Sequence, residues 1–402
     1  MQSVKFSLAG EYWDSQIYSG ILYLFDEKCA LHRVDWSALI DSVAQNNQNI
    51  QTAIRVAFSD SDLFYNPKVK KILRDPSIEG PIKKQLAELS KLEMSESLET
   101  IGAHVKSGNS PFDFLPIDTD IYYHHIFAGG DEGLYSSQGT AGNEGRHFRA
   151  TAQKHHDARF FQIKASDRFT AIAAAVGNDG LFEFNFDKDS EDVLGQEKIL
   201  AKRACSACDW AFQSVMGWTT DSAFLASFKK DRDPHSKFLS RSFDRIVESS
   251  EMFFDDPLAV NKSGITWGSR EKIYKISDDG LTVVDYSPDA LNHKKSQKNQ
   301  KPVQLYKKRS TEKMSFNSKG IVSTGTAPFG TVLEFDDRIT VIRSDSVVDS
   351  FPGEAVHWRI FPRSEHYSNQ LHIIYEDRID VISFVHDYFV DQNEKLYGFS
   401  RG

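Results

Sequence analysis

The sequence predicts an all-β protein, a β-propeller of seven blades, and three observations lead to this prediction. The first is an internal repeat. Phe335–Ile342 reads FDDRITVI, and forty positions later Tyr375–Ile382 reads YEDRIDVI. A period of about 20–50 residues is typical of chains built from repeated supersecondary units, and about 40–50 residues is the size of one four-stranded blade.

The second observation is a glycine-rich hairpin turn that occurs twice. Ile121–Phe127 is followed by Gly-Gly-Asp-Glu-Gly at 129–133, and Phe169–Val176 is followed by Gly-Asn-Asp-Gly at 177–180. Gly, Asn and Asp tolerate the positive φ angles that tight hairpin turns require. We therefore expect each segment to form a strand, a tight turn and a second, aromatic strand.

The third observation is the spacing of the expected hairpins. Further hairpins are expected at Ile21–Phe25, Val215–Phe228 and Ile265–Ile276. With the two glycine hairpins and the two copies of the repeat they give seven centres. Each interval holds about one blade once two insertions are set aside, so seven is the preferred count, with six or eight as alternatives. Because exposed sheet edges favour aggregation, we expect Val4–Leu8 and Lys395–Phe399 to pair and complete one blade.

A helical pattern interrupts the strands between 36 and 108. Apolar residues there recur at spacings of three and four, and Asn66-Pro67 is a typical start of a helix. Further helices are expected at Ser77–Leu92 and Ser95–Val105. The predicted organisation is 1-35 as the first propeller strands, 36-108 as a helical insertion and 109-402 as the rest of the propeller. The insertion either packs on the ring as a lid or buttress or docks a partner.

Composition narrows the class of protein. Lys and Arg number 48 against 57 Asp and Glu, for a net charge of −9. This balance argues against a general binder of nucleic acid or anionic membranes, which needs clustered positive charge. Three cysteines give no disulfide framework, the N-terminus lacks an apolar signal core, and no run of about 18 apolar residues occurs. A cytoplasmic location is expected.

The most unusual charge feature is a basic stretch at 292-313, within an expected exposed loop at 288-313. It could bind RNA, DNA or an acidic protein surface, or simply be a solvated loop. Its candidate partner-binding residues are Lys294, Lys295, Lys298, Lys301, Lys307, Lys308 and Arg309.

Two further groups of residues are of types that bind metals or take part in catalysis. Cys205 and Cys208 have the spacing of half a zinc site or of a redox pair, but no second cysteine pair occurs, which favours two small buried residues. The histidines at 124, 125, 147, 155 and 156 are locally dense, and solvated loop histidines are the favoured interpretation. Adjacent residues of a strand point to opposite faces, so each pair could supply at most one ligand. No catalytic residue, metal ligand or cofactor is predicted.

The two glycine hairpins, at Gly129–Gly133 and Gly177–Gly180, and the count of seven units resemble WD40-like β-propellers. The resemblance covers Val4–Trp36 and about Phe112–Ser400, although the Gly-His and Trp-Asp signatures of those repeats do not recur. It implies a rigid interaction platform, usually without catalysis. The leading hypothesis is therefore a non-enzymatic adaptor that binds protein partners. The alternatives are an enzymatic or metal-binding propeller with a polar mouth, and a nucleic-acid-associated subunit that uses the basic loop.

Overall fold

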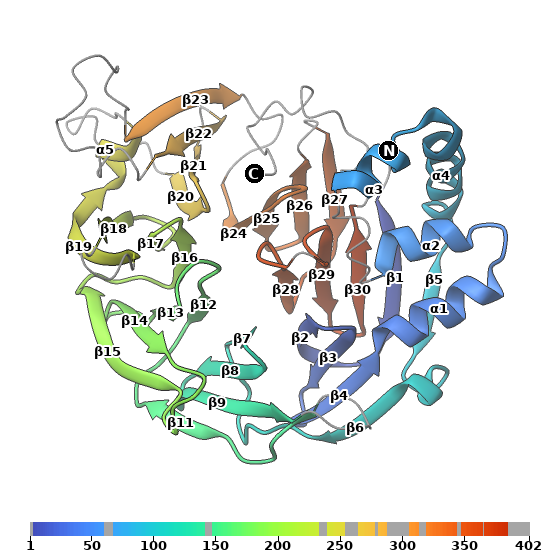
Figure 1. The fold of residues 1–402 in the computed structure, drawn as a ribbon, viewed down its shortest axis with the longest axis horizontal. Coiled ribbons are helices and arrows are strands. Elements are labelled where there is room, and N and C mark those ends of the chain that lie inside the picture. The colour runs from blue at the N-terminus through green and yellow to red at the C-terminus, as the bar shows by residue number, and fades with distance from the viewer. Residues whose placement is uncertain are drawn as a thin grey trace. The chain divides into compact units, whose positions relative to one another are not determined.

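The computed structural model describes residues 3–59, 67–140, 147–232, 239–253, 264–277, 280–287, 305–312, 319–343, 347–364 and 366–384. Its strands form seven sheets (Figure 1), in which the first four strands of each sheet are antiparallel neighbours. The predicted all-β fold of seven blades is thereby confirmed. The chain divides into two compact units. Unit 1 comprises Met1–Leu115, Gly139–Thr151 and Gly325–Gly402, and unit 2 comprises Pro116–Gln138 and Ala152–Thr324.

Unit 1 contains three blades. The first consists of β2 (Tyr12–Tyr18), β3 (Ile21–Asp26), β4 (Ala30–Asp35) and β6 (Val105–Asn109). The second consists of β24 (Ile321–Ala327), β25 (Gly330–Phe335), β26 (Arg338–Arg343) and β27 (Val348–Pro352). The third consists of β28 (His357–Ile360), β29 (Gln370–Tyr375), β30 (Arg378–Ser383), β1 (Val4–Ala9) and β5 (Met94–Ser97).

The third blade joins the two ends of the chain. β1 pairs antiparallel with β30, and β5 then pairs parallel with the free edge of β1. The prediction that Val4–Leu8 completes a blade is confirmed, but its partner is β30. The predicted partner, Lys395–Phe399, lies outside the described residues.

The forty-residue repeat forms equivalent hairpins in the second and third blades. Phe335 is opposite Arg338, and Tyr375 is opposite Arg378, so each hairpin has a two-residue turn. The arginine of each hairpin lies over the aromatic ring that precedes the turn, at 4.2 Å in one and 4.4 Å in the other. The repeat therefore encodes one local structure twice.

In both blades, the strand beside the hairpin is held by the same backbone hydrogen bond. The carbonyl of Asp337 accepts a hydrogen bond from the Gly353 N–H at 2.9 Å, and that of Asp377 accepts one from the Gly10 N–H at 2.9 Å. Gly353 follows β27 and Gly10 follows β1. β1 therefore occupies in the third blade the position that β27 occupies in the second.

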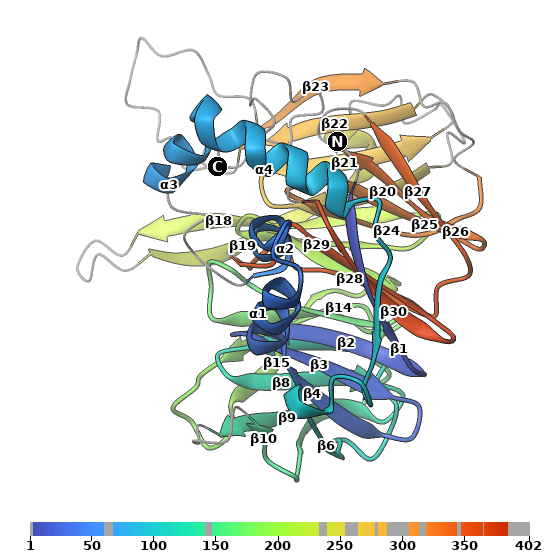
Figure 2. The ribbon, with the colours of Figure 1, turned by 90° about the vertical axis from the view of Figure 1, so that its right-hand side faces the viewer.

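Four helices, α1 (Trp36–Asn46), α2 (Gln51–Phe58), α3 (Pro67–Leu73) and α4 (Pro76–Leu89), lie between β4 and β6 in the chain (Figure 2). The Asp35 side chain caps α1 by accepting from the Ala38 N–H. Trp36 and Phe58 pack edge-on against Phe6 of β1, with ring centroids 5.7 and 6.1 Å away. Unit 1 thus buries the apolar face of α1 and α2.

The expected helix at Ser95–Val105 is wrong. This segment contains the end of β5, a short 3₁₀ turn at Gly102–His104 and the start of β6. The residues between Met94 and Ser97 form a ladder with β1, and Val105 begins a ladder with β4. Strand pairing satisfies the same backbone groups as a helix, and here it overrides a weak local pattern. None of the helices in the described part of the chain is long and apolar enough to cross a membrane.

Unit 2 contains four blades. The first has β7 (Asp118–Tyr122), β8 (His125–Gly130) and β9 (Gly133–Thr140), with β11 (Gln153–His156) beside β9 and β10 (His147–Phe148) beside the end of β9 that belongs to unit 1. The others are β12 (Gln162–Ala165), β13 (Ala171–Ala175), β14 (Leu181–Phe186) and β15 (Leu194–Ala201); β16 (Ala207–Ala211), β17 (Ser214–Trp218), β18 (Ala223–Arg232) and β19 (Leu239–Glu248); and β20 (Gly264–Ser269), β21 (Lys272–Ser277), β22 (Gly280–Tyr286) and β23 (Tyr306–Glu312). A short helix, α5 (Ser249–Phe253), follows β19.

Most of the hairpins expected in unit 2 are confirmed, with one correction. Val215–Phe228 forms β17 and β18, and Ile265–Ile276 forms β20 and β21. Ile121–Phe127, however, is not one strand, because Tyr123 and His124 form a turn between β7 and β8. A Tyr-His pair is not a usual turn sequence, so the pattern gave no sign of it.

Candidate functional site

In unit 2, each blade has a turn after its first strand, and these four turns form a series because the first strands pack side by side. β7, β12, β16 and β20 pack against one another in chain order. Each strand then ends in a turn toward the second strand of its own blade. We call the following turn residues the inner-turn row: Tyr123, His124, Arg168, Phe212, Arg270 and Glu271.

Side chains on β7 hold β12 in register. The Asp118 carboxylate accepts from the Ile163 N–H at 2.8 Å, and the Asp120 carboxylate accepts from the Ala165 N–H at 2.9 Å. Both carboxylates are buried. A charged acceptor strengthens such bonds, and its burial makes them costly to lose. The turns that follow β7 and β12 are therefore fixed side by side.

The same device continues from β12 to β16. The Gln162 side-chain oxygen accepts from the Cys208 N–H at 2.9 Å, and the Lys164 carbonyl accepts from the Trp210 indole N–H at 2.7 Å. The Arg270 N–H then donates to the Trp210 carbonyl at 3.1 Å. Every step along the row is thus tied by hydrogen bonds.

The turn between β7 and β8 presents a rigid tyrosine. Tyr123 and His124 both have positive φ angles, of 44° and 62°, a conformation that bulky residues rarely adopt. The Tyr123 ring stacks on Phe186 with centroids 5.6 Å apart and planes 9° apart, and it meets Tyr122 edge-on. It nevertheless stays 47% exposed. An uncommon backbone conformation therefore displays a large aromatic surface in one orientation.

Arginine 168 links three successive turns. Its guanidinium lies 3.9 Å from the centre of the Phe212 ring and 3.6 Å from the Glu271 carboxylate. About half of the Arg168 side chain is exposed. Tyr122 closes the other side of this turn, because its hydroxyl donates to the Phe169 carbonyl at 3.0 Å. The row thus carries an exposed arginine whose position is set by stacking.

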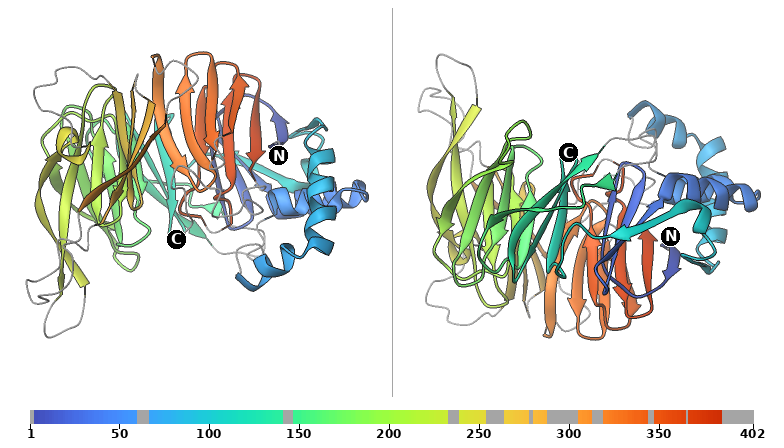
Figure 3. Two further views of the ribbon diagram at one scale, coloured as in Figure 1. Left: turned by 90° about the horizontal axis from the view of Figure 1, so that it is seen from above. Right: turned by 90° about the horizontal axis from the view of Figure 1, so that it is seen from below.

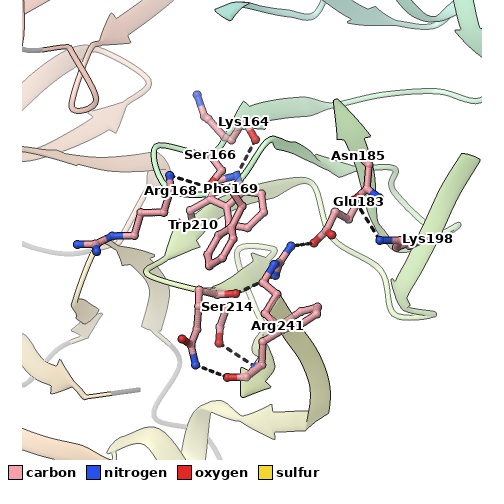
Figure 4. A network of polar contacts seen from close by, with 12 residues as sticks. Lys164, Ser166, Arg168, Phe169, Glu183, Asn185, Lys198, Trp210, Ser214 and Arg241 are labelled. Atoms are coloured by element: carbon pink, nitrogen blue, oxygen red, sulfur yellow. Dashed lines mark hydrogen bonds and ion pairs between the residues drawn. The ribbon is translucent and has the colours of Figure 1, made fainter. Parts of the chain in front are cut away.

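A buried arginine lies beside Phe169 and Trp210, near the row (Figure 4). Arg241 of β19 forms an ion pair with Glu183 of β14 and donates to the Gln213 carbonyl at 2.8 Å. Burial lowers the pKa of the Arg241 guanidinium, and the Glu183 carboxylate opposes that shift. The guanidinium also lies against three aromatic rings, at 4.8 Å from Phe169, 4.9 Å from Trp210 and 4.1 Å from Phe228.

The hairpin that carries Arg241 extends beyond its neighbour β17 (Figure 3). β18 pairs with β17 only over Ala223–Ala226 but continues to pair with β19 as far as Arg232 and Leu239. Next to the row, the Phe228 carbonyl accepts from the Gln213 side chain. Phe243 of β19 packs edge-on against Phe228 and remains 49% exposed. The hairpin therefore adds a second exposed aromatic beside the turns.

The basic residues selected from the sequence are not brought together in the described part of the chain. Lys294, Lys295, Lys298 and Lys301 lie outside it. Lys307, Lys308 and Arg309 belong to β23, which pairs with β22, so this part of the expected loop is a strand. Only the Lys307 side chain is described, and it is exposed. Binding through this stretch stays a prediction.

The expectation of solvated loop histidines is wrong for His125, His155 and His156, which lie in strands and are buried or half-buried. His155 lies at a bulge of β11, and its Nε2 is 2.7 Å from the Ser136 hydroxyl. Burial lowers the pKa of His155 to about 4, so it is neutral at pH 7. His125 is buried, with Nδ1 3.0 Å from the Tyr123 carbonyl, and His156 packs edge-on against Phe182 and Phe184.

The two clustered cysteines are buried thiols. The Cys205 thiol donates to the Gly180 carbonyl at 3.3 Å, and burial raises its pKa to about 12. Burial raises the pKa of Cys208 as well, so neither forms a thiolate at neutral pH. Among the residues that the structure describes, no group of three or more His, Cys, Asp or Glu is placed to hold a metal ion.

The comparisons with known proteins found similarity to solved structures only. No family model and no curated protein matches its sequence. Among solved structures, it is similar to the WD40 β-propeller domain of Doa1, with 7% identity, a TM-score of 0.48 and 98% of each chain covered. It is similar to the Neurospora crassa Pan2 WD40 domain, with 8% identity, a TM-score of 0.44, and 92% of this chain and 89% of that chain covered. A third similar structure is Chaetomium thermophilum Sqt1 bound to the N-terminus of ribosomal protein L10, with 12% identity and a TM-score of 0.40. The match covers 64% of this chain and 68% of that chain.

Proposed function

We propose that this protein is a non-enzymatic scaffold that binds protein partners, and that the inner-turn row of unit 2 is one of its binding surfaces. The observation that carries the proposal is the rigid display of Tyr123 and Arg168. Both side chains are about half exposed, and both are stacked on buried or partly buried rings.

Aromatic residues and arginine are enriched at the centres of protein interfaces, where a few of them supply most of the binding energy. Their effect is greatest when little conformational entropy is lost on binding. Tyr123 is held by Phe186 and by its turn, and Arg168 is held by Phe212, so both are already ordered. An exposed Phe243 beside the row extends the same surface.

The test uses the full chain with Tyr123→Ala and Arg168→Ala. A partner that co-purifies with the wild-type protein is identified, produced separately and titrated against each variant by calorimetry. We expect each substitution to weaken binding by about 10- to 30-fold, as for interface anchors worth about 1.4–2 kcal/mol.

The control is Ile199→Ala on β15, because Ile199 is as exposed as Tyr123, at 48%, but lies away from the turns. It should leave affinity unchanged. Circular dichroism checks that all three variants fold. Unchanged affinity in both row variants would rule out this surface.

A further inference from the structure

In the third blade, β1 pairs with a strand that is distant in the sequence. Ser7 of β1 and Asp380 of β30 hydrogen-bond at 2.7 Å but are 373 positions apart. In the second blade, the equivalent strand β27 follows its partner β26 directly in the chain. A short connection makes re-pairing of a separated strand inexpensive in entropy, and β1 has no such connection to β30. Its place in the blade therefore depends on non-covalent contacts.

The two equivalent strands also differ in burial. Four of the six residues of β1 are buried, whereas none of the five residues of β27 is buried. The apolar face of β1, formed by Val4, Phe6 and Leu8, belongs to the same hydrophobic core as residues of α1, α2 and α4. We call residues 36–104, between β4 and β6, the insertion. It contributes burial to β1 that β27 lacks.

The insertion is bonded to β30, the partner of β1. The last carbonyls of a helix have no partner within that helix. At the end of α2, the Ala57 carbonyl accepts from the Ser383 hydroxyl of β30 at 2.7 Å, and the Phe58 carbonyl accepts from the Trp36 indole N–H at 2.8 Å. Both bonds are buried, so each is costly to lose. The end of α2 is thus fixed to the third blade.

The insertion also contacts β1 itself, on one edge and on one face. Met94–Ser97 of β5 pairs along Phe6–Ala9, on the edge of β1 opposite to β30 (Figure 1). On the face of the strand, the Phe6 ring meets both Trp36 and Phe58 edge-on, and these two rings meet each other at 6.1 Å. Contacts from β30, β5 and the helices therefore surround β1.

We propose that the insertion is a latch for the third blade. Separation of β1 from β30 requires that β5 and the α1–α2 helices move with it, so these elements open together as one cooperative unit. A helical segment that only packed on the blade would leave β1 free to open independently. The inference assigns a conformational role to the insertion and does not rest on the proposed function.

Native-state hydrogen exchange of the full chain, followed by mass spectrometry, tests the latch. Trp36→Leu removes the contact with Phe6 and the donor to the Phe58 carbonyl, and Ser383→Ala removes the donor to the Ala57 carbonyl. In each variant, the amide hydrogens of β1 and β5 should exchange at least about tenfold faster. Those of β25 and β26 in the second blade should change by less than about twofold.

The coupling must also act in the opposite direction, because a coupling free energy is reciprocal. Phe6→Leu changes β1 alone, and it should accelerate exchange in α1 and α2 by a factor similar to that seen in β1. Ile342→Ala in β26 is the control, because Ile342 is fully buried but lies outside the core that β1 shares with the insertion. It should accelerate exchange in β25 and β26 without a comparable change in β1.

Three results would each overturn the latch. The first is unchanged exchange of β1 in folded Trp36→Leu or, if that variant does not fold, in Ser383→Ala. The second is unchanged exchange of α1 and α2 in Phe6→Leu. The third is equal acceleration of β1 by Ile342→Ala and by the insertion variants, because β1 would then open only when the whole unit unfolds.

Discussion

A buried arginine ion pair from each unit can be compared, and these two pairs are built differently. In unit 1, Arg359 of β28 makes two hydrogen bonds of 2.6 Å to the Asp14 carboxylate of β2. In unit 2, Arg241 of β19 meets Glu183 and three aromatic rings. The first pair joins the first strands of two blades, whereas the second joins an outer strand to the neighbouring blade.

The difference shows two uses of the same chemistry. Asp14 and Arg359 are 2% and 6% exposed and are paired directly through two hydrogen bonds, so loss of either leaves a buried charge. Arg241 packs on flat aromatic rings, and an apolar side chain of similar size could make the same contacts. We therefore expect the unit 1 pair to matter for stability and the unit 2 pair for the surface above it.

The largest expected effect is that of Asp14→Ala. This substitution leaves the Arg359 guanidinium buried without its carboxylate, and we expect the free energy of unfolding to fall by about 3–5 kcal/mol. Urea denaturation followed by fluorescence measures the change. A loss below about 1 kcal/mol would contradict the role assigned to this pair.

The next effect concerns pH and His372, whose Nδ1 lies 3.1 Å from the Ser15 hydroxyl in unit 1. Burial, aided by Arg359, lowers the pKa of His372 to about 3. The unfolded chain, with a histidine pKa near 6.5, therefore binds a proton that the folded chain does not. Stability is complete above about pH 6.5 and falls as pH decreases, by about 2 kcal/mol at pH 5 for this group.

His372→Gln should remove this part of the pH dependence, as measured by urea denaturation between pH 7 and pH 4. His155→Gln in unit 2 is the comparison. The pKa of His155 is lowered to about 4, so its own contribution ends at a higher pH than that of His372. A pH dependence identical to that of the wild type in His372→Gln would show that this histidine is not buried neutral.

A smaller change in stability is expected when both members of the unit 2 pair become apolar. Arg241→Met with Glu183→Leu should change the free energy of unfolding by about 1 kcal/mol or less, because apolar residues of similar volume can replace a buried pair. Partner binding at the inner-turn row should nevertheless weaken, because Phe169 and Trp210 lose their support. Stability and affinity are measured on the same preparation, and a large loss of stability with normal affinity would reverse the comparison.

The smallest effect is expected at the repeated hairpin. Arg338 stacks on Phe335 and pairs with Asp337 at the surface. Arg338→Ala should lower the free energy of unfolding by less than about 1 kcal/mol, because exposed ion pairs and cation–π contacts contribute little. Thermal unfolding of Arg338→Ala and of Asp14→Ala, measured side by side, compares the two losses of stability.

The elements that can be predicted from the sequence are those determined by residues close together in the chain. The hairpins at Phe335 and Tyr375 could be predicted because a two-residue turn and its flanking strands lie within fourteen positions. The turn at Tyr123 could not, because its backbone conformation is imposed by stacking on Phe186, which is 63 positions away.

Long-range pairing also hid the elements that matter most for the candidate surfaces. Arg241 and Glu183 are 58 positions apart, and neither stands out among the charged residues of the chain. β5 was assigned to a helix because its pairing with β1 leaves no mark on its own four residues. A buried salt bridge and an added strand depend on residues that become neighbours only in the folded protein.

The pairing of β1 with β30 has a consequence for synthesis on the ribosome. Ser7 and Asp380 hydrogen-bond to each other across 373 positions of the chain. At about 5–20 residues per second, the ribosome takes roughly 20–75 seconds to reach Asp380 after Ser7. Throughout that time Phe6 and Leu8 have no strand partner in β30. β1 is thus synthesised long before β30, its antiparallel partner, and the third blade cannot close until the second of these strands is made.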